Sequence, residues 1–199
     1  MIYECLFLLN YYFYLVLQYL NNPVIQLSSS IILAAFTKST NLPFSGWIAD
    51  AMAGPTPVSA LLHSATMVTA GIFLIYQFWF IIQSYTICSI GCFTSIFGSW
   101  LAVFQSHMKK IIAYSTTSQL GYMMFTCGID NYFSSIFHLF VHAFFKSLLF
   151  LTAGFLLHYI INEVHIYKLS GFSNVLPLSY NFMFIACLSL IGWPTISCY

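Results

Sequence analysis

Three side chains that can exchange a proton recur at four-residue intervals in the apolar run YFSSIFHLFVHAFFKSLLFLTAGFLLH, residues 132–158. His138, His142 and Lys146 would share one face of an α-helix, because residues four apart lie one above the other. A lysine at bilayer depth costs roughly 2.5–3.5 kcal/mol on insertion scales, so such residues normally face the protein interior or a hydrated path. The pattern therefore predicts proton or ion handling inside a membrane.

A histidine pair at this spacing could instead hold a metal ion or an axial position of a haem. A metal would need a third ligand, and no carboxylate or cysteine lies close to His138 and His142 along the helix. A haem would need partner histidines on a second helix, whereas His63 is alone in its apolar stretch. Proton transfer is therefore the better-supported interpretation.

Lys38 and His63 are two further candidates for proton transfer. Lys38 precedes an interruption at Asn41-Leu42-Pro43, and His63 lies within VSALLHSATMVTAG. Burial favours the neutral form of a lysine, and histidine titrates near neutrality, so both could pass a proton on. The alternatives are a lysine that reaches to the membrane surface and a histidine that only hydrogen-bonds a neighbouring helix.

The composition indicates a membrane protein and excludes several other classes. The chain has 199 residues, of which 60% are hydrophobic and 5% are charged, whereas soluble domains carry about 25% charged residues. A net charge of +1 leaves no basic surface for nucleic acid. The six cysteines form no C-x-x-C pair, and no phosphate-binding or dinucleotide-binding signature is present, so we expect no cofactor in this chain.

We expect an all-α, polytopic transmembrane bundle with about six or seven membrane helices. The apolar stretches run over residues 3–20, 24–41, 57–83, 85–104, 111–128, 132–158 and 177–197. Helices should be broken near Leu42-Pro43 and Trp193-Pro194, because proline removes a backbone hydrogen bond. Paired broken helices are typical of the ion site in inverted-repeat transporters. The alternative is that both are ordinary kinks or helix ends.

Three long segments follow one another along the chain: TKSTNLPFSGWIADAMAGPTPVSALLHSATMVTAGIFLI (37–75), KKIIAYSTTSQLGYMM (109–124) and IFHLFVHAFFKSLLFLTAG (136–154). Together they resemble signatures of the antiporter-like membrane subunits of respiratory complex I, the NADH:ubiquinone oxidoreductase, and the chain 5 family most closely. The resemblance extends over roughly residues 25–197. Related chains occur in multisubunit sodium/proton antiporters, which is the alternative function. A structural scaffold that no longer conducts protons is a third possibility.

The resemblance implies a role for each candidate residue. Lys38 matches the lysine on the broken helix of the first half-channel, and His63 matches the bridging histidine that follows it. His138, His142 and Lys146 match the central polar residues between the two half-channels. It also implies one membrane domain over residues 1–199: a peripheral helix (1–22), the broken helix and the helix after it (23–83), and the central helices with the start of the second half-channel (84–199).

The resemblance further implies partners and a location. The family has helices on both sides of the matched region, including one with a glutamate that pairs with the residue at Lys38. We therefore expect a split subunit completed by separate chains, with a partial sequence as the alternative. FMN, iron–sulfur clusters and ubiquinone would lie in other subunits. The abundance of phenylalanine and tyrosine and the absence of arginine are typical of AT-rich mitochondrial genomes. We expect the mitochondrial inner membrane, with a bacterial plasma membrane as the alternative.

Overall fold

The computed structural model describes residues 23–82, 84–160, 165–168 and 171–194, and nearly all of them are helical. The elements are α2 (Pro23–Lys38), α3 (Gly46–Ala51), α4 (Thr56–Val58), the π-helix η1 (Ser59–Thr66), α5 (Thr69–Gln77), α6 (Ser84–Val103), α7 (Met108–Gly128), α8 (Tyr132–Tyr159), the 3-10 helix η2 (Ile166–Lys168), α9 (Phe172–Val175) and α10 (Pro177–Ile191). An all-α bundle was predicted, and it is confirmed for this part of the chain.

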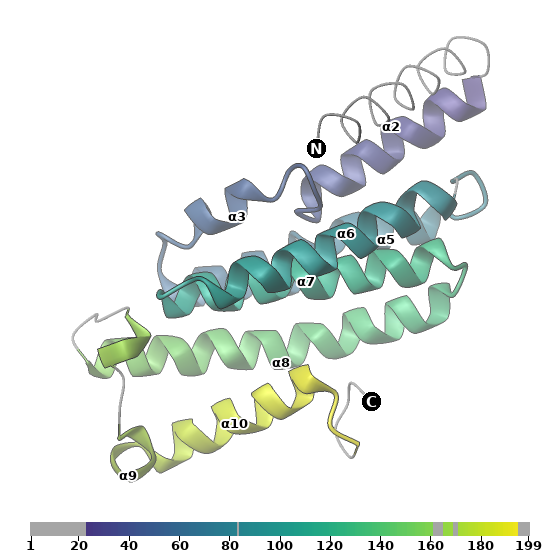
Figure 1. The fold of residues 1–199 in the computed structure, drawn as a ribbon. Helices are drawn as coiled ribbons and strands as arrows, with labels where there is room; N and C mark the ends of the chain where they lie inside the picture. The colour runs from purple at the N-terminus through teal and green to yellow at the C-terminus, as the bar shows by residue number, and fades with distance from the viewer. Residues whose placement is uncertain (1–22, 83, 161–164, 169–170, 195–199) are drawn as a thin grey trace.

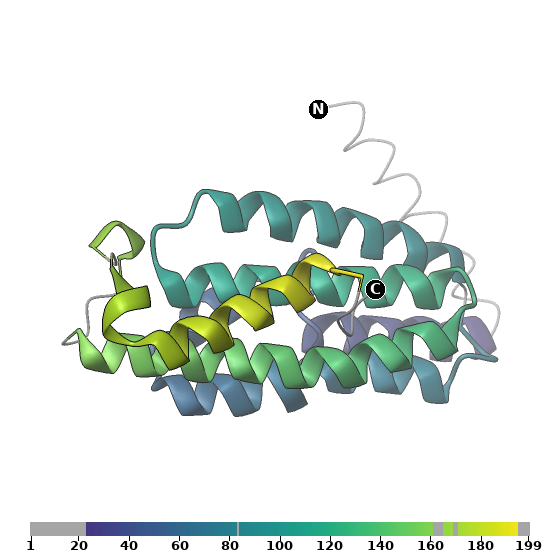
Figure 2. The same ribbon diagram turned by 90° about the horizontal axis from the view of Figure 1, so that it is seen from below.

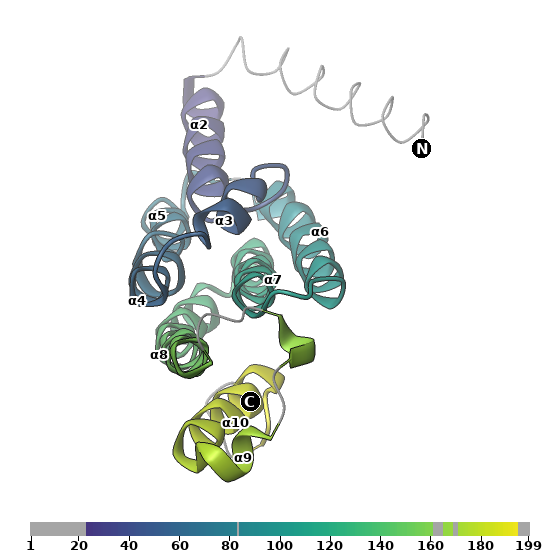
Figure 3. The same ribbon diagram turned by 90° about the vertical axis from the view of Figure 1, so that its left-hand side faces the viewer.

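The long helices pack side by side around α7. Figure 1 shows α6, α7, α8 and α10 running roughly alongside one another, with α2 and α3 above them. Seen end-on, α7 lies in the middle, with α6 on one side, α4 and α5 on the other, and α8 and then α10 below (Figure 3). The residues of α7 are accordingly the most enclosed, and they include a run of polar side chains from Thr116 to Gln119.

Six of the seven predicted apolar stretches correspond to helices, and the first, residues 3–20, lies outside the described residues. By length and hydropathy, two described helices could cross a membrane: Tyr85–Val103 and Tyr132–Tyr159. The stretch at 57–83 differs from the single helix that we expected, because it begins as α4, continues as the π-helix η1 and ends as α5 at Gln77. In η1 the Met67 amide donates to the carbonyl oxygen of Leu62 at 2.9 Å, five residues back.

The first break has the predicted position. Helix α2 ends at Lys38, the peptide before Pro43 is cis, and α3 starts at Gly46. Ser39, Thr40 and Asn41 between them are almost fully buried. The Asn41 side-chain amide donates to the Ser39 hydroxyl at 2.6 Å, and the Phe44 amide donates to the Asn41 carbonyl at 2.7 Å. The Ser39 and Asn41 amides also donate to carbonyl groups of α2, so backbone groups at the break are paired, as a membrane interior requires. The Thr40 hydroxyl and the Asn41 side-chain oxygen have no hydrogen-bond partner among the described residues.

The predicted second break coincides with the end of a helix, and residues 195–199 beyond it lie outside the described residues. Helix α10 ends at Ile191, and Gly192 follows with a φ of 79°, the left-handed conformation that glycine adopts without strain. The Trp193 amide donates to the Leu188 carbonyl at 3.2 Å, which closes the helix end before Pro194. Figure 2, a view from below, shows α10 crossing beneath the bundle at a shallow angle to α8.

Glycine allows α6 and α7 to pack backbone against backbone. A Cβ atom on Gly121 of α7 would lie 2.6 Å from the Ser95 nitrogen and 2.8 Å from the Gly91 carbonyl oxygen of α6. The opposite face of α6 is exposed and apolar, with Phe93, Ile96, Phe97, Trp100 and Val103. Close packing on one side therefore orders α7, while the other side of α6 suits lipid or neighbouring protein.

We predict that Gly121→Ala destabilises the α6–α7 pair. The added methyl group must displace backbone atoms, and such overpacking typically costs about 1–3 kcal/mol. The variant should lower the thermal stability of the protein in its membrane assembly, measured by the temperature at which the assembly dissociates. Gly46→Ala is the control, because a Cβ atom there has no heavy atom within 4 Å. Equal stability of the two variants would contradict this account of the α6–α7 contact.

Candidate functional site

Helix α8 places His138, His142 and Lys146 on the side that faces the bundle. The helix spans 28 residues and buries a stripe that includes His142, Phe145, Lys146 and Leu149. Phe140, Phe144, Leu151 and Phe155 are exposed on the rest of its surface. The titratable side chains therefore point inward together with part of the apolar ones, while the exposed surface of α8 is apolar, unlike that of a helix in a soluble protein.

Lys146 is completely enclosed, with 0% of its surface exposed. Its Nζ donates to the Ser115 hydroxyl at 2.6 Å and lies 3.5 Å from the carbonyl oxygen of Ile112, both on α7. Within the described residues these neutral oxygens are its hydrogen-bond acceptors, and no carboxylate joins them. An amine surrounded in this way can lose its proton without leaving a buried anion unpaired.

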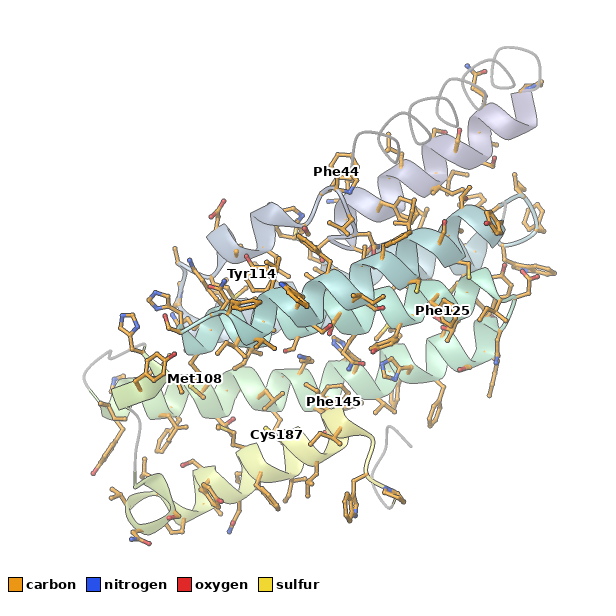
Figure 4. The ribbon with its side chains drawn as sticks, viewed as in Figure 1. Phe44, Met108, Tyr114, Phe125, Phe145 and Cys187 are labelled. Carbon is orange, nitrogen blue, oxygen red and sulfur yellow. The ribbon has the colours of Figure 1, made fainter. Side chains whose placement is uncertain are left out.

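Helix α10 lies on the side of α8 that faces away from α7 (Figure 3). It packs against α8, and its free thiol at Cys187 is exposed. Figure 4 shows Phe145 of α8 and Cys187 of α10 in the layer between these two helices. The Lys146 amine is thus hydrogen-bonded to α7 on one side of α8, and the start of a predicted second broken helix covers another side of α8.

His142 is also completely buried, at 0% exposure, and neither of its ring nitrogens has a hydrogen-bond partner among the described residues. Its ring contacts Phe145 edge-on at a centroid distance of 5.2 Å, and the His138 ring centroid is 6.3 Å away. Buried polar atoms in folded proteins nearly always have a partner, and exceptions often mark functional positions. An imidazole with two unpaired nitrogens can accept a proton on one side and release it on the other.

His138 connects this buried pair to a more open region. Its Nε2 atom lies 2.9 Å from Oε1 of Gln119 on α7. Both residues line a cavity of about 670 Å³ between α6, α7, α8 and the end of α10. The wall also carries hydroxyl groups from Ser99, Ser118, Thr126 and Ser134. The polar groups therefore form a line from this cavity through His138 and His142 to Lys146 and Ser115.

The structure does not bring all five predicted residues together. Lys38 is the last residue of α2 and is exposed, with no described contact to the histidines of α8. His63 lies in η1, which packs against α8, but its side chain lies outside the described residues. His138, His142 and Lys146 thus form one cluster, and Lys38 belongs to a separate part of the fold.

Sequence reasoning missed Ser115 and Gln119, which supply the hydrogen bonds of α7 to this cluster. The two residues lie four apart and therefore on one face of α7. The three α8 residues have the same four-residue spacing. Comparing the positions of polar residues in the sequences of α7 and α8 would therefore have predicted that these two polar faces pair.

Known proteins resemble this chain over most of its length. Residues 6–199 match a family described as NADH:quinone oxidoreductase/Mrp antiporter, transmembrane. The chain is 46% identical over 183 residues to NADH-ubiquinone oxidoreductase chain 5 of Dictyostelium citrinum, covering 89% of this chain and 27% of that protein. It is 51% identical over 162 residues to NADH-quinone oxidoreductase subunit L of Rickettsia typhi, covering 78% of this chain and 24% of that protein.

The fold has a solved counterpart as well. The Mrp complex from Dietzia sp. DQ12-45-1b superposes with a TM-score of 0.78 and 32% sequence identity, covering 88% of this chain and 20% of that chain. This chain spans about a quarter of the length of the curated relatives. With nearly all of its residues matched, the chain belongs to the transmembrane family of NADH:quinone oxidoreductases and Mrp antiporters.

Proposed function

We propose that this chain forms the central part of a proton-translocating membrane subunit of respiratory complex I. The observation that carries the proposal is the line of His138, His142 and Lys146 on the inner side of α8, which meets Gln119 and Ser115 of α7 and ends at a cavity with hydroxyl groups in its wall. The relatives named as chain 5 and subunit L of NADH:quinone oxidoreductases support this assignment. All 199 residues would form one membrane domain of a larger antiporter-like fold.

The spacing of the three groups supports stepwise transfer of protons. Two positive charges one helical turn apart repel each other strongly where little water is present. A proton on Lys146 therefore disfavours a second proton on His142, and the loss of one favours uptake of the other. The chain would pass protons in this way, while NADH oxidation and ubiquinone reduction, with FMN and iron–sulfur clusters, would occur in other subunits of the enzyme.

Lys38 and His63 would extend the pathway into a first half-channel. The helix end at Lys38, followed by buried polar residues, has the geometry expected of an ion site at a broken helix. The exposure of Lys38 implies that further helices cover it in the working protein, since a charged side chain facing lipid is costly. Other complex I membrane subunits, including separate chains that complete this subunit, are the partners that we propose.

A piece of a multisubunit sodium/proton antiporter is the second candidate function. It is favoured by the structural similarity to the Mrp complex. We propose the mitochondrial inner membrane as the location, with a bacterial plasma membrane as the alternative. The low number of charged residues and the many phenylalanines and tyrosines support a mitochondrially encoded protein.

Native purification separates the two candidate functions. The chain would be isolated from membranes in mild detergent, assayed for NADH oxidation in a native gel, and identified by mass spectrometry. Recovery in an NADH-oxidising band together with flavin-containing and iron–sulfur subunits would support complex I. Recovery only in a smaller assembly without redox subunits would support the antiporter.

We predict that Lys146→Ala lowers proton transfer severalfold more than it lowers assembly. The substitution removes the one ammonium group of the cluster and leaves most of the apolar surface of α8 intact. Proton uptake by vesicles containing the assembled complex would be compared with its rate of NADH oxidation. Lys110→Ala, near the start of α7 and outside this cluster, is the control and should have little effect. Full proton transfer by Lys146→Ala would refute the relay.

We also predict that Ser115→Ala weakens the α7–α8 contact. It removes the closest acceptor of the Lys146 amine, and a buried group left without its partner typically costs about 1–3 kcal/mol. Thermal dissociation of the assembly should occur at a lower temperature than in the wild type. Ser147→Ala is a matched control, because the Ser147 hydroxyl, within the described part of the chain, donates to the Phe144 carbonyl of its own helix at 2.8 Å in an exposed hydrogen bond. If both variants dissociate at the wild-type temperature, the Ser115 contact does not stabilise the site.

A further inference from the structure

Two histidines outside the buried cluster face each other at one end of the bundle. His107 directly precedes α7 and His165 directly precedes η2. They pair as an isolated antiparallel β-bridge, and the Ile166 amide donates to the Ser106 carbonyl at 3.1 Å. Their ring centroids are 4.4 Å apart with an interplanar angle of 37°. Two segments far apart in the sequence thus hold two imidazoles side by side.

The pair is accessible from outside the bundle. His165 is exposed and His107 is half-buried. Met108, the first residue of α7, lies at the same end of the molecule as the C-terminal end of α8 (Figure 4). The two histidines therefore lie where the helices end, not in the buried line that contains His138 and His142.

Facing imidazoles on adjacent backbones are a suitable pair of ligands for a late first-row metal ion. Neutral imidazole nitrogen binds zinc, copper and nickel well, and zinc–nitrogen distances are about 2.0–2.1 Å. The ring centroids are close enough that rotation of both side chains about their bonds can bring one nitrogen of each ring to a common ion. We propose that His107 and His165 form a two-histidine binding site for a divalent zinc-like metal ion, with water completing its coordination.

The surroundings predict weak and reversible binding. Among the described residues, no group of three or more histidine, cysteine or acidic side chains is arranged around a common metal position. Lys109 and Lys110 lie close to His107 in the sequence, and their positive charges disfavour binding of a metal cation. The Lys109 ammonium group donates to the Gly54 carbonyl at 3.1 Å. Two protein ligands beside positive charge imply affinity well below that of a structural zinc site with four ligands. The site would respond to metal concentration and would not be permanently filled.

A bound ion would join the start of α7 to the segment that follows α8. These are the helices whose facing residues include Ser115 and Lys146. If the proposed proton pathway is correct, restricting their relative movement should slow proton transfer. The metal site itself does not depend on that pathway, so binding and proton transfer are measured separately.

The test is zinc binding by the intact membrane assembly after removal of bound metal with a chelator. ZnCl₂ would be titrated by calorimetry into wild-type, His107→Gln and His165→Gln assemblies, and zinc X-ray absorption would report the ligands. His158→Gln is the matched control, because His158 is exposed at the end of α8. We expect each of the first two substitutions to weaken one class of zinc site by at least about tenfold, as loss of a ligand should, and His158→Gln to leave it unchanged.

Two results would overturn the proposal. One is an unchanged zinc titration in both the His107→Gln and His165→Gln assemblies. The other is that these variants are less stable than the wild type when the chelator is present but bind zinc as the wild type does. That result would show that the two rings stack on each other and do not bind metal. If zinc binding depends on both histidines but zinc does not change the rate of proton transfer, the metal site is supported. The proposed effect of the bound ion on the proton pathway is then contradicted.

Discussion

The rest of the site depends on one constraint: a lysine amine is fully enclosed in an apolar bundle, at 0% exposure. Such a group is stable only if polar atoms surround it, and here the Ser115 hydroxyl at 2.6 Å is the closest of them. This contact requires α7 to lie directly against α8 with Ser115 facing inward. Helix α6 also packs backbone to backbone against α7 at Gly91 and Gly121. Contacts with both α6 and α8 therefore fix the position of α7.

This constraint accounts for the unusual character of α7. It lies in the middle of the bundle, yet it carries the buried polar residues Thr116, Thr117, Ser118 and Gln119. The three hydroxyl groups among them donate to carbonyl oxygens of α7 itself, so they are hydrogen-bonded without needing a partner on another helix. The same polarity explains why α6 and α8, and not α7, meet the length and hydropathy criteria for a membrane span. In this bundle the central helix α7 is therefore less apolar than α6 and α8, which flank it.

The long apolar stretches predicted the helical bundle, and the prolines predicted the break after Lys38 and the helix end before Trp193. Helical periodicity predicted the inward stripe of His138, His142 and Lys146. These features depend on residues close in sequence, and the helical repeat fixes their relative positions. The pairing of Gln119 with His138 and of Ser115 with Lys146 could not be predicted in the same way, because it depends on how α7 and α8 align. The bridge between His107 and His165 joins two distant loops, and the π-helical turn at Ser59–Thr66 has no clear signal in the local sequence.

The central claim is that the buried histidines change protonation state as the protein works. Infrared difference spectroscopy on the assembled complex, with isotope-labelled histidine and turnover started by NADH, measures this directly. We expect label-sensitive imidazole bands that appear on turnover and are missing from an assembled His142→Asn variant. Identical difference spectra for the wild type and that variant, with NADH oxidation intact in both, would show that His142 keeps one protonation state. That result would contradict the proton relay proposed for α8.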